Sequence, residues 1–173
     1  TMVDTFNFTG AGDLSGTVNG GDDDDTATFA AATGPVNINV GQFVSVENLI
    51  GSTNATGDTL TAAAGGTDFV IDAANEGTAQ NVGSSDEIDF TGFENLAGAA
   101  GNDSFTFANM NASLGSAVDG GAGDNTLVLT VGGGSIDLSS TSASVGYTGE
   151  AFDDGGDSVT GFSNITSLDA GGG

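Results

Sequence analysis

The sequence contains no lysine, arginine, histidine or cysteine, against 24 acidic residues. None of these carboxylates can find a salt-bridge partner within the chain, and a net charge of -24 opposes compaction. Binding to nucleic acid or to an anionic membrane surface is excluded, because both require Lys or Arg. Disulfides are excluded as well, so stability must come from packing, strand pairing or bound cations. Divalent cations, salt or a cationic partner must neutralise the charge.

The missing residue types also restrict catalysis. General acid–base chemistry is left to carboxylates and to Tyr147. Carboxylates that recur at equivalent turns are typical of structure rather than of an active site, so we expect no enzyme. No run of 18 apolar residues occurs, which predicts no membrane insertion. A single proline and eleven phenylalanines argue against disorder.

Short runs of alternating apolar residues recur along the chain. Their period of two places alternate side chains on one face of a sheet, as strands require. Between them lie clusters of Gly, Asp, Asn and Ser, which are turn residues, and no apolar pattern has a helical period. The sequence therefore predicts an all-β fold. The predicted strands include 36–40, 69–71, 88–90, 105–107 and 127–129.

The chain contains an internal repeat that continues across its two ends. Three related tetrapeptides begin at Val46, Phe93 and Phe162, and mark sub-repeats starting near 46, 93 and 162. The end of the chain followed by its beginning reproduces an internal stretch. In that comparison Asp4, Phe6 and Phe8 match Asp103, Phe105 and Phe107, while Val18, Gly20, Gly21 and Thr26 match Val118, Gly120, Gly121 and Thr126. Residues 1–173 are thus predicted to be one repeat unit of a longer tandem or head-to-tail array.

Repeated short strands with glycine-rich turns favour a parallel β-solenoid, of the β-roll or β-helix kind. Coils of about 20 residues would give about eight or nine coils in this length. Each coil would contribute apolar residues to an inward ladder, and glycine would allow the tight corners. A β-sandwich is the alternative fold.

Three segments combine glycine with aspartate in a defined order: 20–28, 98–106 and 120–128. They resemble the nonapeptide G-G-x-G-x-D-x-U-x of the repeats-in-toxin family, in which U is a large apolar residue. The resemblance implies calcium at these turns, held by carbonyl oxygens and by the aspartate at the sixth position. That position is Asp25, Asp103 and, in the third segment, Asn125, which follows Asp124. The competing interpretation is a set of solvated acidic turns without metal.

The candidate metal ligands and turn residues follow from this resemblance and from the spacing of the acidic residues. Asp4 and Asp25, like Asp103 and Asp124, are 21 residues apart, which fits stacking on one edge if a coil has that length. The full candidate set is Asp4, Asp22, Asp23, Asp24, Asp25, Asp58, Gly98, Gly101, Asp103, Gly121, Gly123 and Asp124.

The sequence around these turns is similar to degenerate calcium-binding repeats of giant bacterial surface and adhesin-like proteins. That similarity implies a structural repeat of an extracellular filament or cell-surface protein, self-associating end to end with neighbouring copies. The alternative is an adhesin stalk or a ligand-binding surface module, which would need a regular outer array of threonine or aromatic residues.

Overall fold

A computed structural model describes residues 2–10, 14–53, 57–130, 135–142, 146–153 and 156–170. The predicted all-β fold is confirmed, since these residues form strands and one short 3₁₀-helix, η1 (Val40–Gln42). The strands are β1 (Thr5–Asn7), β2 (Val18–Asn19), β3 (Thr26–Thr28), β4 (Asn37–Asn39), β5 (Phe43–Val44), β6 (Asn48–Ile50), β7 (Thr59–Thr61), β8 (Thr67–Ala73), β9 (Glu76–Asn81), β10 (Glu87–Thr91), β11 (Asn95–Ala97), β12 (Ser104–Phe107), β13 (Leu114–Asp119), β14 (Thr126–Leu129), β15 (Ser135–Ser142), β16 (Gly146–Asp153), β17 (Gly156–Ile165) and β18 (Ser167–Asp169).

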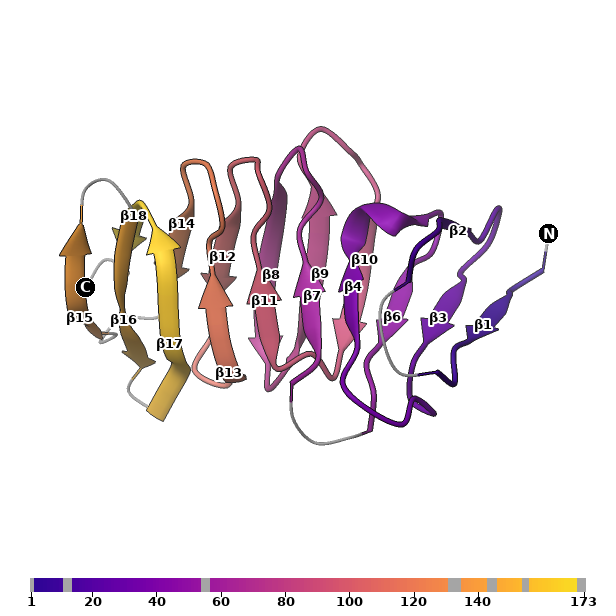
Figure 1. Cartoon of the computed structure of the whole chain (residues 1–173), viewed down its shortest axis with the longest axis horizontal. Coiled ribbons are helices and arrows are strands. Elements are labelled where there is room, and N and C mark those ends of the chain that lie inside the picture. The colour runs from indigo at the N-terminus through magenta and orange to yellow at the C-terminus, as the bar shows by residue number, and fades with distance from the viewer. Residues whose placement is uncertain are drawn as a thin grey trace.

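The strands form three open sheets in an elongated molecule with the two termini at opposite ends (Figure 1). The nine-stranded sheet has the order β1-β3-β6-β10-β9-β8-β12-β14-β18. The seven-stranded sheet has the order β15-β16-β17-β13-β11-β7-β4, and β2 and β5 form a separate two-stranded sheet. From β10 to β15 the chain alternates between the two large sheets, and one apolar core includes residues of both.

Most neighbouring strands are parallel, and five of these parallel pairings join residues 21 or 22 positions apart, about one predicted coil. Thr5 pairs with Thr26, and Thr26 pairs with Asn48, while in the other sheet Leu96 pairs with Val118. Hydrogen bonds between such strands join residues 21 or 22 positions apart. The other parallel neighbours are 25 to 45 residues apart, so the spacing inferred from the acidic residues holds for only part of the stack.

The expectation of parallel strands throughout is wrong for two of them. β9 is antiparallel to both β8 and β10, and β16 is antiparallel to both β15 and β17. Between β8 and β9 the chain reverses in two residues, with Asn75 at a φ of 57°, a conformation that asparagine tolerates in tight turns. The result is two mixed, open sheets packed face to face, a sandwich-like layering.

Each apolar run places alternate side chains in the core, as its period predicted. Phe69, Phe90 and Phe105 are fully buried, and the rings of Phe69 and Phe105 stack at 5.3 Å between centroids on neighbouring parallel strands. Among the described residues no helix has the length and apolarity needed to cross a bilayer.

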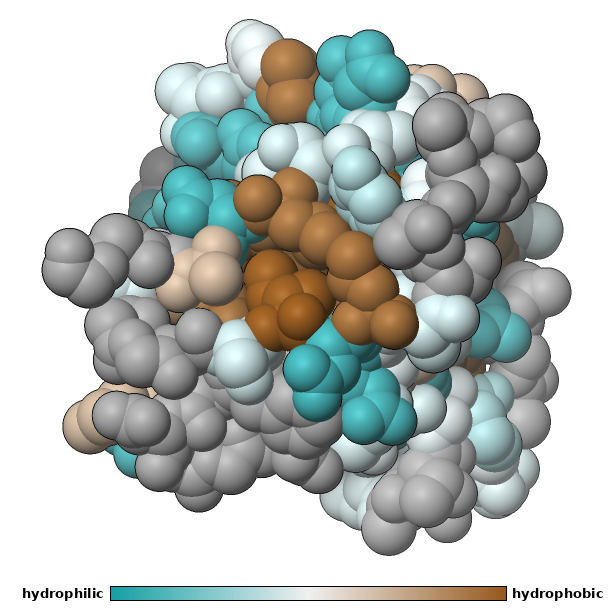
Figure 2. Space-filling model, turned by 90° about the vertical axis from the view of Figure 1, so that its left-hand side faces the viewer, coloured by the Kyte–Doolittle hydropathy of each residue, from teal (hydrophilic) through white to brown (hydrophobic). Residues whose placement is uncertain are grey.

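The two ends of the molecule bury their apolar residues less completely. Phe6 and Phe8 are half-buried at the β1 end, and Ile136 and Leu168 are half-buried at the other. Leu138 on the edge strand β15 is 43 % exposed. Figure 2 shows the β15 end, where apolar atoms form a patch open to solvent. The core is thus incompletely covered where the strand stacks stop.

Candidate functional site

The acidic residue that precedes several strands accepts a hydrogen bond from the main chain of the stacked strand before it. The Asp25 carboxylate accepts from the Asp4 amide at 2.6 Å. The Asp58 carboxylate accepts from the Val36 amide at 3.0 Å. These contacts place carboxylates on backbone N–H groups just before strands β3 and β7. We call this set the carboxylate ladder.

The ladder continues through the Asp103 turn. The Asp103 carboxylate accepts from the Thr67 amide at 2.8 Å and from the Ala99 amide of its own turn at 3.0 Å. Its own amide donates to the Asn125 side-chain oxygen at 3.0 Å. The residue that stacks on Asp103 is therefore Asn125, and the expected stacking of Asp103 with Asp124 is wrong by one position. Asp124 is exposed, and its amide donates to the Asn102 side chain.

Burial distinguishes the ladder residues from ordinary acidic turns. Asp25 and Asp58 are fully buried, and Asp103 is 2 % exposed. Burial raises the pKa of Asp103 above 3.8, and its two amide contacts only partly offset that effect; nearby Asp68 raises it further. A carboxylate in such a place is held by N–H donors, because an unpaired buried charge would be far more costly.

A glycine lies five residues before both Asp25 and Asp103, at positions where no side chain fits. A Cβ at Gly98 would lie 2.0 Å from the Gly120 carbonyl oxygen and 2.7 Å from the Asp103 carboxylate. A Cβ at Gly20 would lie 1.9 Å from the Ser45 carbonyl oxygen and 2.4 Å from the Asp25 carboxylate. The glycine-and-aspartate order of the motif thus follows from close backbone approach combined with carboxylate capping.

The repeated Glu-Asn pair of the first two sub-repeats belongs to the same ladder. The Glu94 carboxylate accepts from the Asp58 amide at 3.0 Å, and the Asn95 side chain donates to the Asp58 carbonyl at 3.2 Å. The Glu47 carboxylate likewise accepts from the Asp25 amide at 2.7 Å. The sequence shows the repeated Glu-Asn pair but not its role. The role follows from the contacts with Asp25 and Asp58 on the neighbouring strands.

The ladder leaves one buried oxygen without a partner. Both Asp103 oxygens accept main-chain hydrogen bonds, and both Asp58 oxygens accept from Ser52 or Val36. The Oδ2 atom of Asp25 is buried and has no hydrogen-bond partner. Of these three turns, the Asp25 turn therefore has the one buried carboxylate oxygen that a cation would provide with a partner.

The remaining calcium candidates are dispersed. Asp4, Asp22, Asp23, Asp24 and Asp124 are exposed. Gly121 and Gly123 have φ values of 70° and 101°, whereas Gly98 and Gly101 are required for close backbone approach. In the part of the chain that the structure describes, no group of three or more acidic side chains gathers as metal ligands would.

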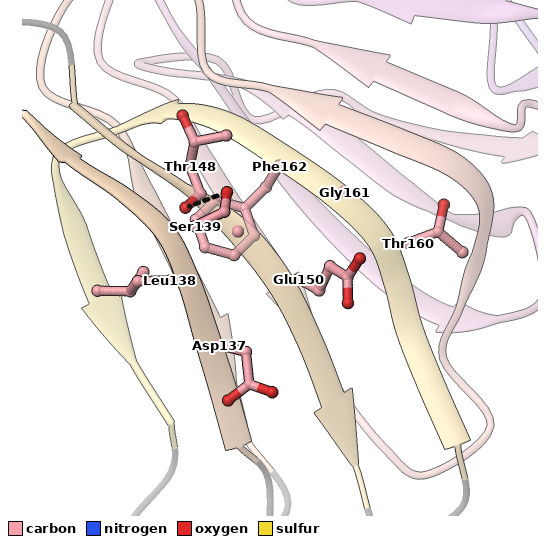
Figure 3. A pocket seen from close by; sticks show the side chains of 9 residues that line it. Asp137, Leu138, Ser139, Thr148, Glu150, Thr160, Gly161 and Phe162 are labelled. Carbon is pink, nitrogen blue, oxygen red and sulfur yellow. Dashed lines mark hydrogen bonds between the residues drawn. The ribbon is translucent and has the colours of Figure 1, made fainter.

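A shallow hollow of about 420 Å³ lies on β15, β16 and β17, at residues that no sequence motif had indicated (Figure 3). Asp137, Glu150 and Thr160 line it, and the Ser139 hydroxyl donates to the Thr148 carbonyl at 3.2 Å within it. Gly149 lies opposite Phe162, and no side chain fits there, because a Cβ would lie 2.1 Å from the Asp137 carbonyl oxygen and 3.0 Å from the Phe162 ring.

Comparisons with known proteins identify no relative: no family model, no curated protein and no solved structure matches this chain.

Proposed function

We propose that the chain is a structural unit of a β-solenoid that associates end to end with copies of itself in an extracellular filament or giant surface protein. It acts by packing and not by catalysis. The observation that carries the proposal is the stacking of strands at intervals of 21 or 22 residues, with apolar rungs that stop half-covered at both ends. The two antiparallel three-stranded segments, β8-β9-β10 and β15-β16-β17, are local insertions in this winding.

The acidic exterior supports the same function. A chain with a net charge of -24 keeps neighbouring rods apart sideways, whereas the open ends offer unpaired strand edges and apolar surface. Association is therefore directed along the stack. Since all its charges have one sign, such an array should lengthen as salt screens the repulsion between copies.

Association should depend on the apolar patch at the β15 end. We expect Leu138→Asp to abolish self-association, because a carboxylate there would be buried without a partner when a second copy docks. Leu138 is 43 % exposed in the single chain, so folding should be little affected. Val82→Asp is the matched control, since Val82 is 57 % exposed away from the two end strands. Sedimentation velocity across a concentration series measures the effect.

A wild-type chain that sediments as a monomer at all concentrations, in low and in high salt, would contradict the proposal. Equal loss of association in both variants would show that added charge, and not the end patch, is responsible. Unchanged thermal melting of Leu138→Asp shows that the variant is folded.

Calcium at the Asp25 turn is a second proposal, supported by the unpartnered Asp25 oxygen. The Asp25 carboxylate supplies a hard oxygen ligand of the kind that calcium prefers. Asp22, Asp23 and Asp24 do not gather around it as ligands, so main-chain carbonyl oxygens and water would complete the coordination. Bound there, the ion would neutralise part of a run of four adjacent carboxylates. The Asp58 and Asp103 carboxylates have less need of a cation, because each of their oxygens already accepts a hydrogen bond.

Calorimetric titration of chelator-treated protein tests the calcium proposal. We expect binding heat in the wild type and its loss in Asp25→Asn, which keeps an oxygen to accept the Asp4 amide but removes the charge. Asp124→Asn, at an exposed turn, should bind as the wild type does. Absence of heat and of any change in melting at millimolar calcium would end the claim.

A further inference from the structure

The meander β15-β16-β17 in the seven-stranded sheet repeats the meander β8-β9-β10 of the nine-stranded sheet. In both, an inward residue of the first strand faces alanine, and the next inward residue faces glycine. The paired residues of the first meander are Phe69 with Ala79 and Ile71 with Gly77, and those of the second are Ile136 with Ala151 and Leu138 with Gly149. The third strands agree as well, since Phe90 faces Gly77 and Phe162 faces Gly149.

Two later strands of the same chain, β12 and β13, cover the first meander and the strand that follows it, β11. β12 pairs in parallel with the outer edge of β8, which places Phe105 beside Phe69 and Phe107 beside Ile71. β11 enters the other sheet directly after the meander and pairs with β13, which places Leu96 beside Val118. As a result Phe69 and Ile71 are fully buried.

At the second meander, no strand among the described residues provides this cover. β18 follows it and enters the other sheet beside β14, as β11 enters beside β7. Both β15 and β18 are edge strands of their sheets. Leu138, which corresponds to the buried Ile71, is 43 % exposed. The edges of β15 and β18 thus lack the partners that β12 and β13 provide at the first meander.

The first two strands of the chain have the sequences of the absent ones. Asp4, Phe6 and Phe8 in and beside β1 correspond to Asp103, Phe105 and Phe107 in and beside β12, and Val18 of β2 corresponds to Val118 of β13. β1 is an edge strand, and β2 pairs only with β5 in a two-stranded sheet that continues neither large sheet. That small sheet would become the continuation of a large one if a strand were added to the free edge of β2.

The connecting lengths allow the same match in a tandem chain. From β18 to a following β1, the sequence provides residues 170–173 and 1–4, which is as many as residues 51–58 between β6 and β7. The β6–β7 connection crosses from the nine-stranded to the seven-stranded sheet and ends at Asp58. A following β1, preceded by Asp4, would make the same crossing.

We propose that β1 of one copy adds to β15 of the preceding copy, and that β2 of the same copy adds to β18. This inference rests on the proposed end-to-end association and specifies its register. Phe6 then lies beside Ile136 and Phe8 beside Leu138, while Val18 lies beside Leu168. The seven-stranded sheet of one copy continues as the nine-stranded sheet of the next, so the sheets exchange roles at each junction.

On the outer faces, this register places Asn7 beside Asp137 and Asn19 beside Asp169. All four residues are exposed, and the chain has no cysteine of its own, so pairs of single-cysteine variants report the junction without background. Residues directly opposite on neighbouring strands are about 4.8 Å apart, which lies within the Cα separation that disulfides span. The two pairings join opposite ends of the molecule, so a bond within one copy is excluded (Figure 1).

The experiment mixes two single-cysteine variants under mild oxidation and measures covalent dimer on a non-reducing gel. Asn7→Cys with Asp137→Cys should shift to dimer, and so should Asn19→Cys with Asp169→Cys. Asn7→Cys with Asp169→Cys should remain monomeric, because it tests the rival register in which the nine-stranded sheet simply continues and β1 adds to β18. Each variant oxidised alone gives the background.

Dimer formed by the rival pair, and not by the first two, would overturn the register while leaving end-to-end association intact. Association by sedimentation without any of these cross-links would do the same. Absence of association would overturn both the register and the proposed function, so the two failures are distinguishable.

Discussion

Gly98→Ala should lower the free energy of unfolding by about 3 kcal/mol, which is the upper end of the range for overpacking a well-packed site. The new methyl group would lie 2.0 Å from the Gly120 carbonyl oxygen and 2.7 Å from the Asp103 carboxylate. A carbonyl in a stacked backbone cannot move aside as a flexible side chain can. The same shift would disturb the Asp103 contact with Ala99 in its own turn and the contact with Thr67, which joins this turn to β8.

Urea denaturation followed by circular dichroism measures this loss. Gly65→Ala is the matched control, because a Cβ there meets no atom within 4 Å and Gly65 also lies in a turn. The control should change stability by less than about 1 kcal/mol, as surface substitutions usually do. If Gly98→Ala and Gly65→Ala unfold at the same urea concentration, close backbone approach does not explain the glycine of the motif.

Sequence reasoning recovered the elements whose physics is local. The runs at 69–71, 88–90, 105–107 and 127–129 all lie in strands with alternate residues buried, because a period of two is a property of the strand itself. The antiparallel direction of β9 and β16 was not recovered, because a short alternating run is the same in either direction.

The role of the acidic residues could be predicted only in part. Glycine and aspartate at fixed spacing correctly indicated a repeated turn at Asp25 and Asp103. The destination of each carboxylate was not predictable, because the N–H group that it meets belongs to a residue 21 positions away for Asp25 and 36 positions away for Asp103. The Glu47 and Glu94 contacts were missed for the same reason. One residue of stacking register also decided that Asn125, and not Asp124, continues the ladder.

Acidification from neutral pH toward the raised pKa of Asp103 should stabilise the protein. Burial raises the pKa of this carboxyl in the folded chain above its ordinary value of 3.8. The folded state therefore binds more protons than the unfolded state between 3.8 and the raised value. Stability is highest at the acidic end of that window and falls as pH rises through the folded pKa. Relief of repulsion among 24 acidic residues acts in the same direction.

The two contributions separate by variant and by salt. Asp103→Asn should flatten the pH dependence of the urea midpoint, whereas Asp72→Asn, which removes an equal charge from an exposed position, should follow the wild-type slope. High salt should reduce the part due to long-range repulsion, because exposed charges are screened, and should leave the part due to burial of Asp103. The groups that face this carboxyl are the Thr67 and Ala99 amides and the Asp68 carboxylate, and the chain contains no cation to reverse the sign. A midpoint that falls steadily from pH 7 to pH 5 would show that the ladder carboxylates stabilise the fold mainly as charged acceptors. Burial of Asp103 would then not control its protonation.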